Sequence, residues 1–179
     1  ITTLCDTKPG EEWSRERIKA LKSEVAAAGM HIAGIESVNV HDAIKTGSPD
    51  RDRYIQNYIN TLEHLGQEDI HLVCYNFMPV FDWTRTELAR KRPDGSTVLA
   101  YTQKAVDALK PEEMFASIRS DCNGAVMPGW EPERMAGIKD LFAMYENIDD
   151  EQLFANLKYF LEAIMPVCDH YDINMAIHP

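Results

Sequence analysis

Several side chains that can bind metals or transfer protons lie where apolar segments of the sequence end. Reactive groups of an α/β barrel gather where strands end and the following loops begin. Polar groups at the end of a buried strand also need hydrogen-bond partners or a chemical task. The candidate positions chosen by this rule are Cys5, Asp6, Glu36, His41, Tyr75, Asn76 and His178.

His178 is the most informative of these positions, because it ends a short apolar segment that we predict to be a strand. Alternation along a strand puts Asn174, Ala176 and His178 on one face. If that face looks into a barrel, the imidazole can bind a divalent metal at the barrel mouth. A histidine that is only hydrogen-bonded at a strand end fits the same spacing, and spacing alone favours that simpler interpretation.

Glu36 ends another predicted strand, on the face that also carries Ile32 and Gly34. Its carboxylate fits three roles: a metal ligand, an acid or base, or half of a buried ion pair with an arginine. His41 follows in the loop VNVHDAIK, where it would either reach a ligand or face the solvent. Periodicity does not choose among these alternatives.

An aromatic segment, YNFMPVFDWTR, occupies residues 75–85 after a third predicted strand. Its aromatic side chains would either pack around Pro79 or form the wall of a pocket that includes Trp83. In the second case Asn76 would bind hydroxyl groups and Arg85 would bind a carboxylate. Arginine suits that task because its planar guanidinium matches the two carboxylate oxygens.

The elements that position these side chains alternate between strands and amphipathic helices. Strands are expected over 1–5, 31–38, 70–76 and 172–178, and helices over 12–28, 51–66 and 150–170. Strands with apolar residues on both faces, separated by such helices, predict neighbouring parallel strands covered by helices. No GxGxxG follows a strand, which argues against dinucleotide binding.

A complete (β/α)8 barrel takes about 250 residues, so we expect the 179 residues to form one partial barrel domain over 1–179. The alternation breaks at about 78–148, which we interpret as an excursion from the sheet made of a hairpin and helices. The turn signal of the hairpin is Arg-Pro-Asp-Gly-Ser at residues 92–96. Both ends of the sequence look cut.

The composition excludes several classes of protein. A net charge of −11 argues against nucleic acid as a partner, because phosphates would be repelled. No apolar run approaches the roughly 20 residues of a membrane helix, and the first residues do not resemble a signal peptide. The four cysteines are scattered without a CxxC pair, which predicts reduced thiols in a cytoplasmic protein.

Residues 75–101, YNFMPVFDWTRTELARKRPDGSTVLAY, closely resemble the signature stretch of the mannonate dehydratases. Further similar blocks follow the same order along nearly the whole chain. They are IESVNVHDAIKTG (35–47), RDRYIQNYINTL (51–62), MPGWEP (127–132) and MAIHP (175–179).

The resemblance implies a barrel similar to that of xylose isomerase and a bound Mn²⁺ or Fe²⁺. It also implies conversion of D-mannonate to 2-keto-3-deoxy-D-gluconate in glucuronate breakdown, by a cytoplasmic homodimer. His178 matches the His-Pro motif that provides a metal ligand, and we assign substrate binding to Asn76, Arg85, His41 and Trp83. The remaining ligands and the catalytic acid and base are expected downstream, outside this chain.

Two other functions remain open from the sequence. A metal-dependent sugar or sugar-acid isomerase or epimerase would use the same barrel, and it would conserve the mass of its substrate. A non-catalytic sugar-acid binding relative would lack the downstream ligands.

Overall fold

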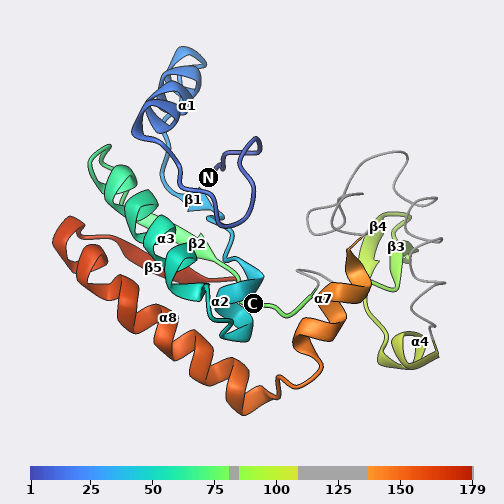
Figure 1. Cartoon of the computed structure of the whole chain (residues 1–179). Helices are drawn as coiled ribbons and strands as arrows, with labels where there is room; N and C mark the ends of the chain where they lie inside the picture. The colour runs from blue at the N-terminus through green and yellow to red at the C-terminus, as the bar shows by residue number, and fades with distance from the viewer. Residues whose placement is uncertain (81–84, 109–136, 179) are drawn as a thin grey trace. The chain divides into compact units, whose positions relative to one another are not determined.

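The computed structural model describes residues 1–80, 85–108 and 137–178, and the chain divides into two compact units (Figure 1). The first unit comprises Ile1–Pro79 and Ala143–Pro179. The second comprises Val80–Phe142. The first unit contains three parallel strands, and the second contains an antiparallel hairpin.

The sheet of the first unit has the order β1 (Ile35–Glu36), β2 (Leu72–Tyr75) and β5 (Asn174–Ile177). Both pairings are parallel, with Glu36 opposite Cys74 and Cys74 opposite Ala176. The predicted parallel arrangement of these segments is therefore confirmed. The first predicted strand is shorter than expected, because only Thr2 forms a parallel bridge, to Ile35, before the chain turns at residues 5–7.

The helices of the first unit lie close to their predicted positions. They are α1 (Arg15–Ala27), α2 (Asp42–Thr46), α3 (Arg51–Gly66) and α8 (Asp150–Tyr171). Side-chain caps fix the starts of α1 and α8: the Ser14 hydroxyl accepts a hydrogen bond from the Arg17 N–H, and the Asp149 carboxylate accepts one from the Gln152 N–H. Helix α2 was not expected, since its residues were predicted to be a loop.

Helices cover one face of the three strands. Ile35, Val73 and Tyr75 point toward α3 and α8 and are almost completely buried with the ring of Phe160. The opposite face carries Glu36, Cys74 and Ala176, all of which are at least partly exposed. Alternation along the strands thus separates an apolar, helix-covered face from a more accessible face, as in one wall of an α/β barrel.

Helix α2 is only five residues long, and contacts with other helices hold it in place. The Tyr145 hydroxyl donates to the Asp42 carboxylate at 2.7 Å. The Asn156 amide of α8 donates to the Lys45 carbonyl at 2.9 Å. Gly47 ends the helix in the left-handed conformation, with φ of 70°. A helix this short is unstable alone, so α2 depends on α8 for its position.

The second unit contains the hairpin expected around residues 92–96. Strands β3 (Glu87–Lys91) and β4 (Thr97–Ala100) pair antiparallel. Gly95 takes a φ of 82° in the turn, where the Arg92 N–H donates to the Ser96 carbonyl at 2.9 Å. Helix α4 (Gln103–Ala108) follows, and α7 (Ile138–Tyr145) crosses the boundary between the units.

Among the helices that the structure describes, none combines the length and the apolar character that crossing a membrane requires.

Gly47→Ala tests the close packing of α2 against α8. A Cβ at this position would lie 2.7 Å from the Asn156 side-chain oxygen, and the left-handed backbone would also be strained. We expect a loss of about 2–4 kcal/mol in the free energy of unfolding, measured by urea denaturation. Gly29→Ala is the matched control, because Gly29 has a φ of 73° and nothing within 4 Å of the added Cβ. It should cost only about 1 kcal/mol, and equal losses would contradict the packing argument.

Candidate functional site

The carboxyl ends of β1 and β5 bring together two residues that the sequence marked separately. The His178 Nε2 lies 3.3 Å from the Glu36 Oε1, and both side chains are partly exposed. Register explains this meeting, since Glu36, Cys74 and Ala176 lie side by side across the sheet and His178 follows Ala176 by two residues. His178 therefore lies on the accessible face, where its predicted role requires it to be.

Of the three roles open to Glu36, the ion pair with an arginine is the one that the structure does not support. Within residues 1–80, 85–108 and 137–178, no arginine lies within ion-pair distance of its carboxylate. Its recorded partner is His178. The roles of metal ligand and of acid or base both stay open for Glu36.

His178 and Glu36 offer the kinds of donor atom that bind a divalent transition metal. An imidazole nitrogen and a carboxylate oxygen are ligands that Mn²⁺ and Fe²⁺ accept. Burial raises the pKa of the neighbouring Cys74 thiol, and the Glu36 charge raises it further, so this sulfur is a neutral thiol at pH 7. No group of three His, Cys, Asp or Glu side chains able to hold a metal occurs in the described part of the chain. Two donors form only part of a metal site.

Asn76 follows β2 and is 8% exposed. Lys45 of α2 approaches it from the side: the ammonium Nζ lies 3.4 Å from the Asn76 Oδ1 and donates to the Met78 carbonyl at 2.9 Å. Lys45 itself is 3% exposed. The sequence did not mark Lys45, because nothing in the letters DAIKTG distinguishes a buried lysine from a solvated one.

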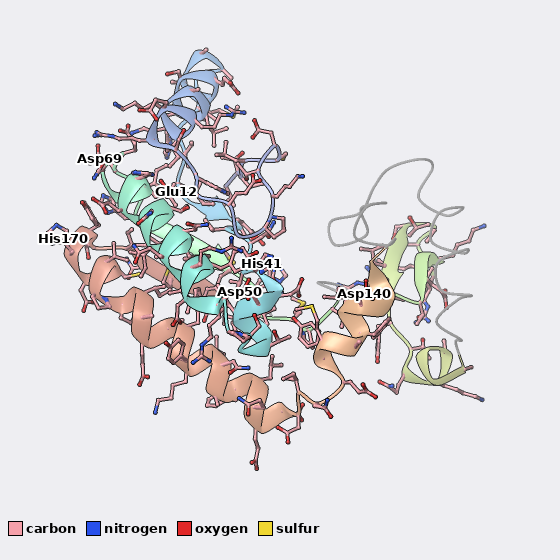
Figure 2. The ribbon with its side chains drawn as sticks, viewed as in Figure 1. Glu12, His41, Asp50, Asp69, Asp140 and His170 are labelled. Carbon is pink, nitrogen blue, oxygen red and sulfur yellow. The ribbon has the colours of Figure 1, made fainter. Side chains whose placement is uncertain are left out.

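His41 is the N-cap residue of α2, and Figure 2 labels it there. Its Nδ1 accepts a hydrogen bond from the Ala43 N–H at 3.1 Å, so the neutral ring carries its proton on Nε2. The ring stacks on Tyr54 with centroids 3.6 Å apart and an interplanar angle of 10°. One ring nitrogen is thus committed to the helix, and binding of a substrate by His41 stays a prediction.

The remaining predicted positions belong to different parts of the chain. Arg85 is half-buried and belongs to the second unit, whereas Asn76, His41 and His178 belong to the first. Trp83 lies outside the described residues. Cys5 and Asp6 are exposed, and Asp6 pairs with Arg17 at 2.9 Å. Tyr75, which the strand-end rule also selected, is buried in the core beside Phe160.

Comparison with known proteins gives one consistent answer. The family model described as D-mannonate dehydratase (UxuA) matches residues 1–179. A mannonate dehydratase of Brachyspira hyodysenteriae is 63% identical over the whole chain, which covers 50% of that protein. One from Geobacillus thermodenitrificans is 52% identical over 95% of the chain and 46% of its own length. The chain thus spans about half the length of the curated relatives it matches.

A solved structure agrees with these sequence matches. The crystal structure of mannonate dehydratase from Streptococcus suis superposes with a TM-score of 0.82 at 39% identity, over 100% of this chain and 46% of that one. The α/β fold class expected from the sequence is confirmed, including the expectation that only part of the fold is present.

The N-cap role of His41 predicts a pH dependence. Burial lowers its pKa below 6.5, against the opposing effect of Asp42 and Asp50. A depressed histidine pKa contributes stability that is fully present above about pH 6.5 and is lost as the pH falls through the folded-state pKa. His41→Asn keeps a capping oxygen but does not titrate. Between pH 7.5 and 5.0, urea denaturation should show a smaller loss of stability in His41→Asn than in wild type. His31→Asn, at an exposed histidine, is the control and should retain the wild-type slope.

Proposed function

We infer that this chain, which belongs to the D-mannonate dehydratase family, provides part of the metal and substrate site of an enzyme that removes water from D-mannonate. The product would be 2-keto-3-deoxy-D-gluconate, in the breakdown of glucuronate. The observation that carries the assignment of the site is the approach of Glu36 and His178 at 3.3 Å on the accessible face of the parallel strands.

His178 would hold the metal, Mn²⁺ or Fe²⁺, through its imidazole. Glu36 would either share the ion with His178 or orient the imidazole through a hydrogen bond, as carboxylates do beside metal-bound histidines. When bound, the ion would supply positive charge that stabilises the carboxylate of the substrate as its C2 proton leaves. The further ligands, and the base and acid that move the protons, would come from residues outside those described in this chain.

The substrate would be held by polar donors and a cation. Asn76 would donate to a substrate oxygen from the end of β2, and Arg85 would bind the carboxylate or support the loop that binds it. His41 and Trp83 are the other two residues to which we assign substrate binding. The reaction then removes the C2 hydrogen and the C3 hydroxyl as water, and the resulting enol becomes the ketone.

The enzyme would work in the cytoplasm as a homodimer. The three cysteines that the structure describes, Cys5, Cys74 and Cys168, are free thiols, which supports a reducing compartment. The homodimer stays a prediction.

Product analysis tests the reaction itself. A full-length protein carrying this sequence, loaded with Mn²⁺ and given D-mannonate, should form a deoxy-keto acid whose mass is lower by one water. An isomer of unchanged mass would support the isomerase alternative, and binding without turnover would support a non-catalytic relative.

His178→Ala should abolish dehydration and reduce the bound metal severely, because one of about four protein ligands is lost. The fold should persist, since His178 lies at the exposed end of β5. Metal content and turnover are measured together on the full-length protein. His170→Ala is the control, because His170 is an exposed histidine on α8 (Figure 2) and should retain both. Stoichiometric metal with near-normal turnover in His178→Ala would make His178 a structural strand-end histidine.

Arg85→Lys tests the proposed carboxylate contact. A point charge replaces a planar fork, so KM for D-mannonate should rise about tenfold or more while kcat changes less. Arg90→Lys is the matched control, since Arg90 is exposed and pairs with Glu87 in the hairpin. Unchanged KM and kcat in Arg85→Lys would exclude Arg85 from substrate binding.

A further inference from the structure

The contact between Lys45 and Asn76 has a chemical direction. An ammonium group only donates hydrogen bonds, so the side of the Asn76 amide that faces Lys45 must be its oxygen. The separation of 3.4 Å is long for a strong bond, yet the charge still fixes which way the amide is turned. The NH₂ group of Asn76 therefore points away from the Lys45 ammonium.

The two N–H donors of that NH₂ group have no protein acceptor in the described part of the chain, although Asn76 is 8% exposed. Buried polar groups are almost always hydrogen-bonded, and each exception needs an explanation. Strand alternation puts Asn76 on the same face as Cys74, which the register aligns with Glu36. The Asn76 NH₂ group is thus a buried donor without a described partner. It lies at the end of β2, the strand between β1, which ends in Glu36, and β5, which His178 follows.

Protein groups, rather than water, surround the Lys45 side chain and hold it in place. Its Nζ also donates to the Met78 carbonyl at 2.9 Å, and its own carbonyl accepts from Asn156. Burying an ammonium group is costly unless fixed partners compensate it. With 3% of its surface exposed, Lys45 presents almost no area to a ligand, so it can influence a ligand only through the groups that it contacts.

We propose that Lys45 is a positioning residue, whose ammonium turns the Asn76 amide so that its NH₂ group donates to an oxygen of the bound sugar acid. This inference rests on the proposed function, because it takes the sugar acid as the ligand. The charge behind the amide also polarises its N–H bonds toward an acceptor. An anionic, oxygen-rich ligand offers such acceptors, whereas a ligand that presents a donor at this point would leave opposing donors facing each other.

A double-mutant cycle on the full-length protein tests whether Lys45 acts through Asn76. Lys45→Met and Asn76→Ala should each raise KM for D-mannonate about tenfold. The double variant should be no worse than Asn76→Ala alone, because the two residues form one unit. Effects that multiply would overturn the proposal, since Lys45 would then bind substrate directly or act elsewhere. Lys158→Met, at an exposed lysine paired with Glu162, is the control and should retain the wild-type KM.

Two further variants separate positioning from a merely structural role. Asn76→Asp keeps the size of the side chain and a partner for Lys45 but has no N–H donors. Its KM should therefore be at least as high as that of Asn76→Ala, while its melting temperature stays near wild type. A wild-type KM in Asn76→Asp would overturn the donor role. Lys45→Arg keeps a charged donor, so its KM should stay within about threefold of the wild-type value. If Lys45→Met does not fold, Lys45→Arg still tests whether the positive charge is what matters.

An NMR measurement tests the contact between Lys45 and Asn76 without relying on the dehydration reaction. With ¹⁵N-asparagine labelling, the NH₂ resonances of Asn76 are those that vanish in Asn76→Ala. They should shift in a variant that lacks the ammonium, Lys45→Met, and remain near their wild-type positions in Lys158→Met. Unchanged resonances in Lys45→Met would overturn the proposal even if the protein dehydrates D-mannonate. If the wild type does not dehydrate D-mannonate, the proposed function fails, while these resonances still decide whether Lys45 fixes Asn76.

Discussion

Strand β2 hydrogen-bonds to a parallel neighbour on each side, and this pairing brings Glu36, Asn76 and His178 to one edge of the sheet. Its register sets Glu36 beside Cys74 and Cys74 beside Ala176. Because parallel strands end at the same edge, the residues that follow them meet there although they are far apart in the sequence. Val73, at the centre of β2, is completely buried, so the helices α3 and α8 hold that register from the covered side.

Much of this fold could be predicted from the sequence, and the limits have physical causes. The amphipathic helix predicted over 51–66 is α3, which has these bounds and buries Ile55, Leu62 and Leu65. The family resemblance and the strand-end rule both selected His178. Its approach to Glu36 could not be predicted, because it depends on the register between strands rather than on either segment alone. Helix α2 and its buried Lys45 were missed because tertiary contacts, not local propensity, create them.

The polar contacts of α2 show how a weak local element becomes a rigid one. A histidine caps its first turn, a tyrosine binds its first carboxylate, and an asparagine from α8 binds the Lys45 carbonyl. Each contact gives a polar group of α2 a hydrogen-bond partner at a fixed position. The accuracy with which Lys45 meets Asn76 therefore depends on helices that contribute no group to the site, and a change in α8 would alter the site without touching it.

The separation of β2 from β5 along the chain has a consequence for how the protein folds. Val73 and Met175 are partners across the sheet, yet about 100 residues lie between them, including the whole second unit. The entropic cost of closing a loop rises only with the logarithm of its length, by about 0.6 kcal/mol for each doubling. The intervening residues therefore cost little equilibrium stability, but they make this pairing a non-local and slow step. We expect the β1–α3–β2 segment to collapse early, with α8 and β5 joining later to complete the strand end on which His178 lies.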